Sequence, residues 1–145
     1  MIIMTSLKIL VDSNILVYAI NDSSPKQSLA QKFLNDNLGN LLIAPQNILE
    51  TLRILTHSKF PNPLTPVQAQ SDLTQITDNL ILVIPTEKTL FTALELIKKY
   101  TLTAKKVFDA YLAATALSND INTIATDNVK DFKIFKGLKV INPFE

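Results

Sequence analysis

Short apolar runs alternate along the chain with longer segments in which apolar residues recur every three or four positions. The short runs are typical of buried strands, whereas the periodic segments are typical of amphipathic helices. The predicted strands cover residues 7–11, 40–44, 80–84, 122–126 and 138–141. The predicted helices cover residues 13–20, 25–37, 45–55, 66–79, 86–100 and 105–119.

This alternation of strands and helices predicts the fold class. Strands joined by helices form right-handed βαβ units, so the strands run mainly parallel and helices cover both faces of the sheet. We therefore expect an α/β fold of three layers, α/β/α, with a central sheet of about five strands. Pro25 is expected to open its helix, and Thr86 is expected to be the N-cap of another.

The length of 145 residues is that of one domain, so we expect a single domain over residues 1–145. The absence of cysteine excludes disulfides, thiolate metal sites and a cysteine nucleophile, and the two glycines exclude glycine-rich phosphate loops. No apolar run has the length of a membrane span and no signal-peptide pattern is present, which predicts a cytoplasmic location. Residues 1–6 have no evident structural role, so Met1 and Met4 are alternative starts.

Charge is unevenly distributed, although the formal net charge is only +1. Between Lys98 and Lys139, eight lysines against four aspartates give a local charge of +4 and leave the rest slightly acidic. Such a basic sector either steers RNA toward the protein or is an ordinary solvated surface, and the pattern alone does not decide between the two.

Four carboxylates are predicted to meet at one edge of the sheet. Asp12 follows the first strand and Asp127 follows the fourth, and α/β proteins bind ligands at the carboxyl ends of parallel strands. Glu50 lies near the start of the helix after the second strand, and helical side chains tilt back toward the helix N-terminus. Asp109 also lies near the N-terminus of its helix, where the helix dipole favours a carboxylate.

Convergent carboxylates repel one another, and a divalent cation relieves that repulsion. Mg²⁺ prefers hard oxygen ligands and Mn²⁺ accepts the same ones, whereas a chain with no cysteine and one histidine is poorly suited to zinc. Each acid also has a structural explanation, such as a helix cap for Asp12, a turn for Asp127 and the surface for Glu50. Asp109 is the hardest to explain in this way, because a carboxylate in the apolar segment VFDAYLAATAL is costly unless paired or metal-bound.

Four segments resemble, in order, the acidic motifs of one family. They are ILVDSNILVYA, PQNILETLRIL, VFDAYLAATAL and IATDNVKDF. These segments are similar to the motifs of PIN domains, and most of all to those of the VapC-like toxins of bacterial type II toxin–antitoxin pairs. The resemblance covers residues 7–143 and implies a metal-dependent endoribonuclease with Mg²⁺ or Mn²⁺ as its cofactor.

The resemblance also assigns residues. The family's acidic quartet of catalytic residues and metal ligands falls on Asp12, Glu50, Asp109 and Asp127. Asn14 falls where a small polar residue supports Asp12 or a metal-bound water, and Asp131 matches a frequent extra acid that either serves a second metal or caps a turn. Many relatives have one residue between the last acidic positions, whereas TDNVKDF has three, which puts the assignment of Asp131 in more doubt than that of Asp127.

The expected reaction is attack of a metal-activated water on an RNA phosphodiester, which leaves a 5′-phosphate and a 3′-hydroxyl. In this hypothesis Asp12 and Asp109 are the main ligands, while Glu50 and Asp127 complete the shell or orient the water.

Five further residues have less certain roles. Thr126 either binds a ligand carboxylate or closes the strand, and Arg53, one helical turn after Glu50, contacts phosphate, Glu50 or another surface group. Lys105 and Lys106 either hold the RNA backbone or form a polar loop. His57 is expected at the surface or at a helix end rather than as a general base.

Two other classes of function are weaker alternatives. One is a phosphatase of the haloacid-dehalogenase type, a family with a DxD motif after its first strand. This chain has Asn14 in place of the second aspartate of that motif. A catalytically silent PIN-like module that binds RNA or protein is the second alternative. The resemblance to toxins further implies an antitoxin that enters the acidic groove, and a homodimer through residues 25–37 and 66–79.

Overall fold

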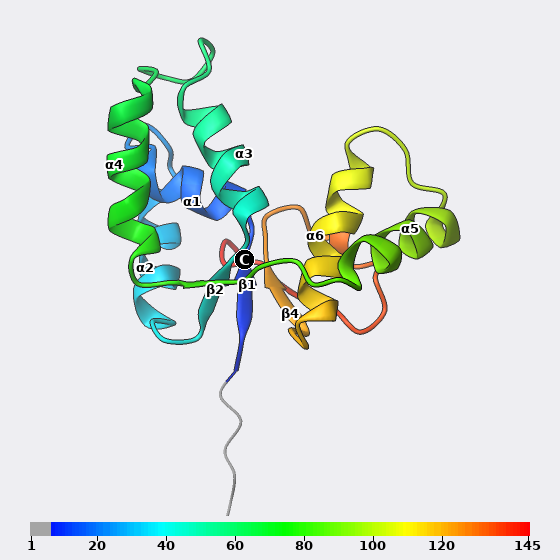
Figure 1. The fold of residues 1–145 in the computed structure, drawn as a ribbon. Helices are drawn as coiled ribbons and strands as arrows, with labels where there is room; N and C mark the ends of the chain where they lie inside the picture. The colour runs from blue at the N-terminus through cyan, green and yellow to red at the C-terminus, as the bar shows by residue number, and fades with distance from the viewer. Residues whose placement is uncertain (1–6) are drawn as a thin grey trace, which may run out of the picture.

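The computed structural model describes residues 7–145 and contains a five-stranded sheet in the order β3-β2-β1-β4-β5, with every neighbouring pair parallel (Figure 1). The strands are β1 (Ile9–Val11), β2 (Leu41–Ile43), β3 (Ile81–Leu82), β4 (Thr123–Ala125) and β5 (Lys139–Ile141). The helices are α1 (Ser13–Ile20), α2 (Gln27–Asp36), α3 (Pro45–Leu55), α4 (Pro66–Thr77), α5 (Thr89–Tyr100), α6 (Lys106–Ser118) and α7 (Val129–Phe132). The predicted α/β fold with a parallel sheet is confirmed.

Two hydrophobic cores lie on the two faces of the sheet, because neighbouring residues of a strand point to opposite sides. Leu10 and Leu42 face the core that α5 and α6 close, while Ile9 and Val11 face the core that α1, α2 and α4 close. Figure 1 shows these two groups of helices on opposite sides of the strands. The central strand β1 is therefore buried on both faces, which explains its uninterrupted apolar sequence.

The order of the strands creates a switch point beside β1. The chain runs outward from β1 to β2 and β3, and then returns through α5 and α6 to place β4 on the other side of β1. Val11 pairs with Ala125, and the backbone N–H of Asp12 donates to the carbonyl of Ala125 at 2.9 Å. The residues that follow β1 and β4 consequently emerge side by side, at the place where open α/β sheets bind ligands.

Two predicted helix starts are wrong. Pro25 lies in a turn before α2 instead of opening it, because the hydroxyl of Ser24 accepts a hydrogen bond from the N–H of Lys26, the N-cap residue, at 3.1 Å. Thr86 is not the N-cap of α5, whose N-cap is Lys88. The Thr86 hydroxyl instead accepts from the N–H of Lys88 at 3.2 Å and stabilises the turn before the helix.

The remaining helices and strands lie where the sequence predicts them, but the observed strands are shorter than the predicted ones. α7 has no counterpart among the predicted helices, because a single turn is too short to show a helical period. β3 forms one edge of the sheet, and its Ile81 and Leu82 are exposed. Within residues 7–145, no helix combines the length and the hydrophobicity that crossing a membrane requires. The alternative start at Met4 lies outside the described residues.

Candidate functional site

Asp12 is held by hydrogen bonds at the end of β1. Its Oδ1 accepts from the backbone N–H of Ser13 at 2.8 Å, so Asp12 is also the N-cap of α1. Its Oδ2 accepts from the Thr126 hydroxyl at 2.7 Å and from the Asn14 amide at 3.3 Å. Asp12 is only 5% exposed, and burial raises its pKa, while the hydrogen bonds from Thr126 and Ser13 oppose that rise and the charge of Glu50 adds to it.

Glu50 reaches the same edge from α3. This helix begins with a proline, and the Asn47 side chain accepts from the N–H of Ala44, which fixes the first turn. One oxygen of the Glu50 carboxylate accepts from the Ser13 hydroxyl at 3.1 Å, and the other accepts from the Gln46 amide at 3.0 Å. The bond to Ser13 connects Glu50 directly to the turn that carries Asp12.

Asp109 lies in the first turn of α6 and is half-buried. Burial raises the pKa of its carboxyl to about 6, and the negative charges of Asp131, Asp12 and Glu50 contribute in the same direction, while Lys105 acts against them. The pKa therefore reports a local excess of negative charge around a partly desolvated carboxylate.

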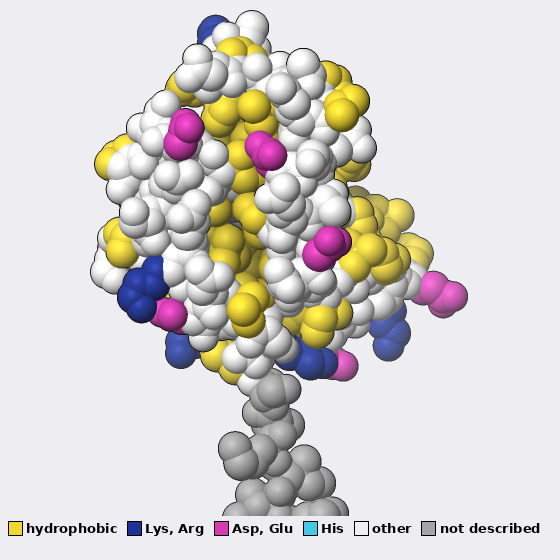
Figure 2. Space-filling view, turned by 90° about the vertical axis from the view of Figure 1, so that its left-hand side faces the viewer, with side chains coloured by type: hydrophobic (Ala, Val, Ile, Leu, Met, Phe, Trp, Pro, Cys, Tyr) yellow, Lys and Arg dark blue, Asp and Glu magenta, His cyan; other side chains and the backbone are white. Residues whose placement is uncertain are grey.

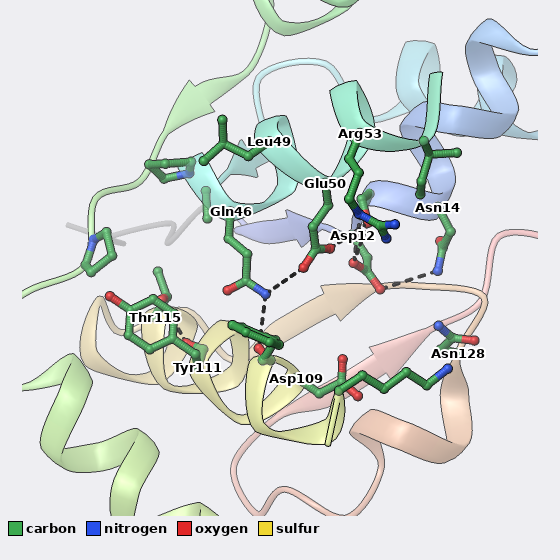
Figure 3. A pocket seen from close by; sticks show the side chains of 17 residues that line it. Asp12, Asn14, Gln46, Leu49, Glu50, Arg53, Asp109, Tyr111, Thr115 and Asn128 are labelled. Atoms are coloured by element: carbon green, nitrogen blue, oxygen red, sulfur yellow. Dashed lines mark hydrogen bonds between the residues drawn. The ribbon is translucent and has the colours of Figure 1, made fainter. Parts of the chain in front are cut away.

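Asp12, Glu50 and Asp109 line one cavity of about 880 Å³. Figure 3 shows Asp12 and Glu50 on the wall beneath α3 and Asp109 on the facing wall formed by α6. The rest of the lining is largely apolar, and two of its hydrophobic side chains, Leu49 and Phe108, are 68% and 61% exposed. The structure thus brings three of the four predicted acids together in an open, partly apolar cavity.

Asp127 is placed differently from the other three acids. Its carboxylate Oδ2 lies 2.6 Å from Nζ of Lys26 and accepts from the Tyr18 hydroxyl at 2.9 Å, and the residue does not line the cavity. The hydrogen bond from Lys26 is the main cause of a lowered pKa for Asp127. Asp131, on α7, does not line the cavity either, but among the acids its charge raises the pKa of Asp109 most.

The other predicted residues divide between the cavity and the surface. Arg53 and Lys105 line the cavity, whereas Lys106 is exposed and does not line it. His57 is exposed, and its Nδ1 accepts from the N–H of Lys59 at 3.0 Å, which confirms its assignment to the surface near a helix end.

The donor set fits a hard divalent cation. The carboxylates of Asp12, Glu50 and Asp109 line the cavity, and the pKa of Asp109 is raised first by burial and then by the negative charges of its neighbours. Among residues 7–145, no group of three or more His, Asp or Glu side chains is placed so that it could hold a metal ion by itself. A hard divalent cation does not need three protein ligands, because it can take one or two carboxylates and fill its other positions with water and phosphate.

Sequence reasoning missed several residues of this network. Ser13 and Gln46 both donate to Glu50, and Gln46 had a usable signal, because it lies one helical turn before Glu50 on α3. Lys26 and Tyr18 lie 101 and 109 positions from Asp127 in the sequence, so no local pattern indicated their contact with it.

The fold and the site together define a class of protein. It is a three-layer α/β domain with a cavity lined by three acidic residues at the switch point of a parallel sheet. The PIN domain family matches residues 9–137, and the chain belongs to this family. No curated protein matches the chain.

Solved structures with the same fold include toxin–antitoxin proteins. VapBC2 from Rickettsia felis, bound to a DNA fragment from its promoter, is 24% identical over 94% of this chain and 98% of its own, with a TM-score of 0.70. A toxin–antitoxin complex from Klebsiella pneumoniae is 19% identical over 95% and 99%, with a TM-score of 0.69. VapC20 from Mycobacterium tuberculosis, a toxin that cleaves the sarcin–ricin loop, is 12% identical over 88% and 95%, with a TM-score of 0.70.

Proposed function

We propose that this chain is a single-domain, Mg²⁺-dependent endoribonuclease that acts in the cytoplasm as the toxin of a toxin–antitoxin pair. The observation that carries the proposal is the convergence of Asp12, Glu50 and Asp109 on one cavity, in a chain of the PIN domain family. The folds of the Klebsiella complex and of the toxin that cleaves the sarcin–ricin loop support the same assignment.

Asp12 and Asp109 are the proposed main ligands of the cation, and Glu50 orients the attacking water. Bound Mg²⁺ or Mn²⁺ supplies positive charge that stabilises the phosphate and lowers the pKa of a bound water. The hydrogen bonds from Thr126 and Ser13 favour the ionised form of Asp12 and fix the directions of its two oxygens. Glu50 has both oxygens occupied by hydrogen bonds from Ser13 and Gln46, which fixes its carboxylate beside that of Asp12.

Arg53 and Lys105 are the proposed contacts to the RNA backbone. Both line the cavity that holds the carboxylates, so a phosphate placed at the acids lies within reach of positive charge. The exposed Phe108 and Leu49 provide apolar surface beside them. Lys106, outside the cavity, is not included in this proposal.

Neither Asp131 nor Asp127 lines the cavity, and Asp131 is the one proposed to act on the site from outside it, since its charge acts on Asp109 while the carboxylate of Asp127 is paired with Lys26. We expect the Asp131→Asn variant to cleave RNA more slowly, because it loses a negative charge that acts on Asp109. Removing this negative charge also lowers the pKa of Asp109, so the acidic limb of the pH–rate profile moves to lower pH.

Asp120→Asn is the matched control for this prediction, because Asp120 is exposed and does not line the cavity. Its pH–rate profile is expected to equal that of the wild type. An Asp131→Asn profile that coincides with both would contradict the assignment of Asp131 to the site.

Two kinds of protein partner belong to the proposal. A cognate antitoxin would place a basic side chain in the acidic cavity, where the excess negative charge around Asp109 favours it. The homodimer through α2 and α4 stays a prediction. These helices border a furrow with an apolar floor that includes Leu34 and Ile76, and Figure 2 shows hydrophobic side chains along it.

The proposed function is tested by incubating the purified protein with a mixed RNA pool in Mg²⁺ or Mn²⁺, with and without EDTA. We expect metal-dependent cleavage that leaves 5′-phosphate and 3′-hydroxyl ends, and no cleavage by Asp12→Asn. Asparagine is a good N-cap residue, so this variant keeps the start of α1 while it loses the negative charge.

Products with cyclic phosphate ends would exclude the proposed attack by water. A wild-type protein that binds Mn²⁺ and RNA but does not cleave would favour the catalytically silent module instead. Equal cleavage by the wild type and Asp12→Asn would point to a contaminating nuclease and would remove the support for this site.

A further inference from the structure

Lys26 lies beside two aromatic rings and one carboxylate and does not line the cavity. Its Nζ lies 5.0 Å from the centre of the Tyr18 ring, 5.1 Å from that of Phe144 and 2.6 Å from Oδ2 of Asp127. The two rings contact each other edge to face, with centroids 5.2 Å apart. Cation–π contacts and a short ion pair act together here, so Lys26 holds Asp127 more firmly than an isolated surface pair would.

Asp127 is in turn connected to Asp12 through Asn14. The backbone N–H of Asp127 donates to Oδ1 of Asn14 at 3.2 Å. This bond orients the Asn14 amide, whose Nδ2 donates to Oδ2 of Asp12 at 3.3 Å and to the Thr126 hydroxyl at 3.1 Å. Thr126, the residue before Asp127, donates to the same oxygen of Asp12 at 2.7 Å. The position of the turn therefore determines two of the donors to Asp12.

We propose that Lys26, packed against Tyr18 and Phe144, positions the carboxylate of Asp12 through Asp127 and Asn14. In this proposal Asp127 is a positioning residue whose side chain anchors the turn, and it is not a metal ligand. The inference rests on the proposed function only in so far as Asp12 is taken to bind the cation. The hydrogen bonds from Lys26 and Tyr18, which lower the pKa of Asp127, keep this anchor ionised.

The alternative to this proposal is that Lys26 restrains Asp127 from acting as a metal ligand. The two interpretations predict opposite effects of Lys26→Met on Mn²⁺ affinity. If Lys26 anchors the turn, its removal loosens Asn14 and Thr126, and both Mn²⁺ affinity and cleavage rate fall by about tenfold, as is typical for the partners of metal ligands. If Lys26 instead restrains Asp127 from acting as a ligand, the same change frees that carboxylate, and Mn²⁺ affinity stays equal or rises. Titration of Mn²⁺ followed by electron paramagnetic resonance distinguishes these outcomes without any cleavage assay.

A structural readout keeps the test independent of the nuclease proposal. Exchange of the Asp127 backbone N–H with solvent, measured by ¹⁵N NMR, is expected to accelerate in Lys26→Met because its bond to Asn14 is weakened. Tyr18→Phe removes only the hydroxyl that donates to Asp127 and keeps the ring beside Lys26, so a smaller change in the same direction is expected. If Lys26→Met fails to fold, Tyr18→Phe takes its place as the variant that tests the anchor.

Lys32→Met is the matched control, because Lys32 is also a lysine of the α2 segment with an aspartate partner, Asp36, but is exposed and remote from the cavity. It is expected to equal the wild type in all three measurements, and Lys26→Arg is expected to restore most of the loss. Unchanged exchange and unchanged Mn²⁺ affinity in Lys26→Met would overturn the proposal. A wild type that neither binds Mn²⁺ nor cleaves RNA would overturn the proposed function, while the exchange data would still decide whether Lys26 anchors the turn.

Discussion

Asp109→Asn is expected to lower the rate of metal-dependent RNA cleavage by at least about 100-fold, because a metal-ligand charge contributes several kcal/mol and each 1.36 kcal/mol is a factor of ten. Asparagine has nearly the same size and shape as aspartate but carries no negative charge. Burial, together with the charges of Asp131, Asp12 and Glu50, raises the pKa of Asp109 to about 6. A bound cation would relieve this repulsion, and the neutral asparagine removes the charge that would attract it.

The same substitution is expected to stabilise the protein in the absence of metal. Above pH 6 the wild type must keep Asp109 ionised in a partly desolvated place near three other acids, and the neutral amide avoids this penalty. After allowance for its partial exposure, the gain in the free energy of unfolding at pH 8 is about 1 kcal/mol. Thermal unfolding with EDTA measures this gain, and Mn²⁺ should raise the unfolding temperature of the wild type alone.

Combined loss of activity and gain of metal-free stability is a specific signature of a metal-binding carboxylate. A purely structural Asp109 would give a less stable variant, in which activity falls only because less protein is folded. Asp120→Asn again serves as the control, with neither activity nor stability changed. A variant that keeps full activity would remove Asp109 from the proposed site.

Mn²⁺ affinity is expected to fall by about 10- to 100-fold between pH 7.5 and pH 5, because protons compete with the metal for raised-pKa carboxylates. At pH 5 the Asp109 carboxyl, with a pKa of about 6, is mostly protonated before metal binds, and the raised pKa of Asp12 adds to the effect. Titrations with Mn²⁺ at a series of pH values measure the change. In Asp109→Asn the Mn²⁺ affinity should depend less steeply on pH. A wild-type Mn²⁺ affinity that is independent of pH would contradict the prediction.

Without metal, Asp109 makes the folding stability depend on pH in the direction opposite to that usual for an acidic residue. Because the pKa of Asp109 is higher in the folded protein than its ordinary value of 3.8, the folded state binds more protons between about pH 4 and pH 6. The contribution of Asp109 to stability therefore decreases as pH rises through this window. Asp127 acts in the opposite sense, since its lowered pKa gives a stabilisation that is lost as pH falls through that value.

The sequence was sufficient for the fold class and for the expectation that Asp12, Glu50 and Asp109 lie around one cavity. Periodicity separated strands from helices, because burial on a strand repeats every two residues and burial on a helix every three or four. The parallel topology followed from their alternation and predicted that Asp12 and Asp127 emerge at one edge of the sheet, while the tilt of helical side chains predicted that Glu50 reaches the same edge. Asp109 was identifiable because a carboxylate in an apolar helix demands a compensating partner.

Hydrophobic periodicity fixes which face of an element is buried, and therefore the sequence determined the layers of this protein, the strand end that Asp12 follows and the helix start that carries Asp109. It could not determine where Asp127 points, because that depends on Lys26 and Tyr18, which are more than a hundred residues away along the chain. Only the tertiary structure brought these side chains together, turned the Asp127 carboxylate from the cavity and gave Asp131 the stronger influence on Asp109. Long-range electrostatic pairing has no local sequence period, and so it is decided by the fold.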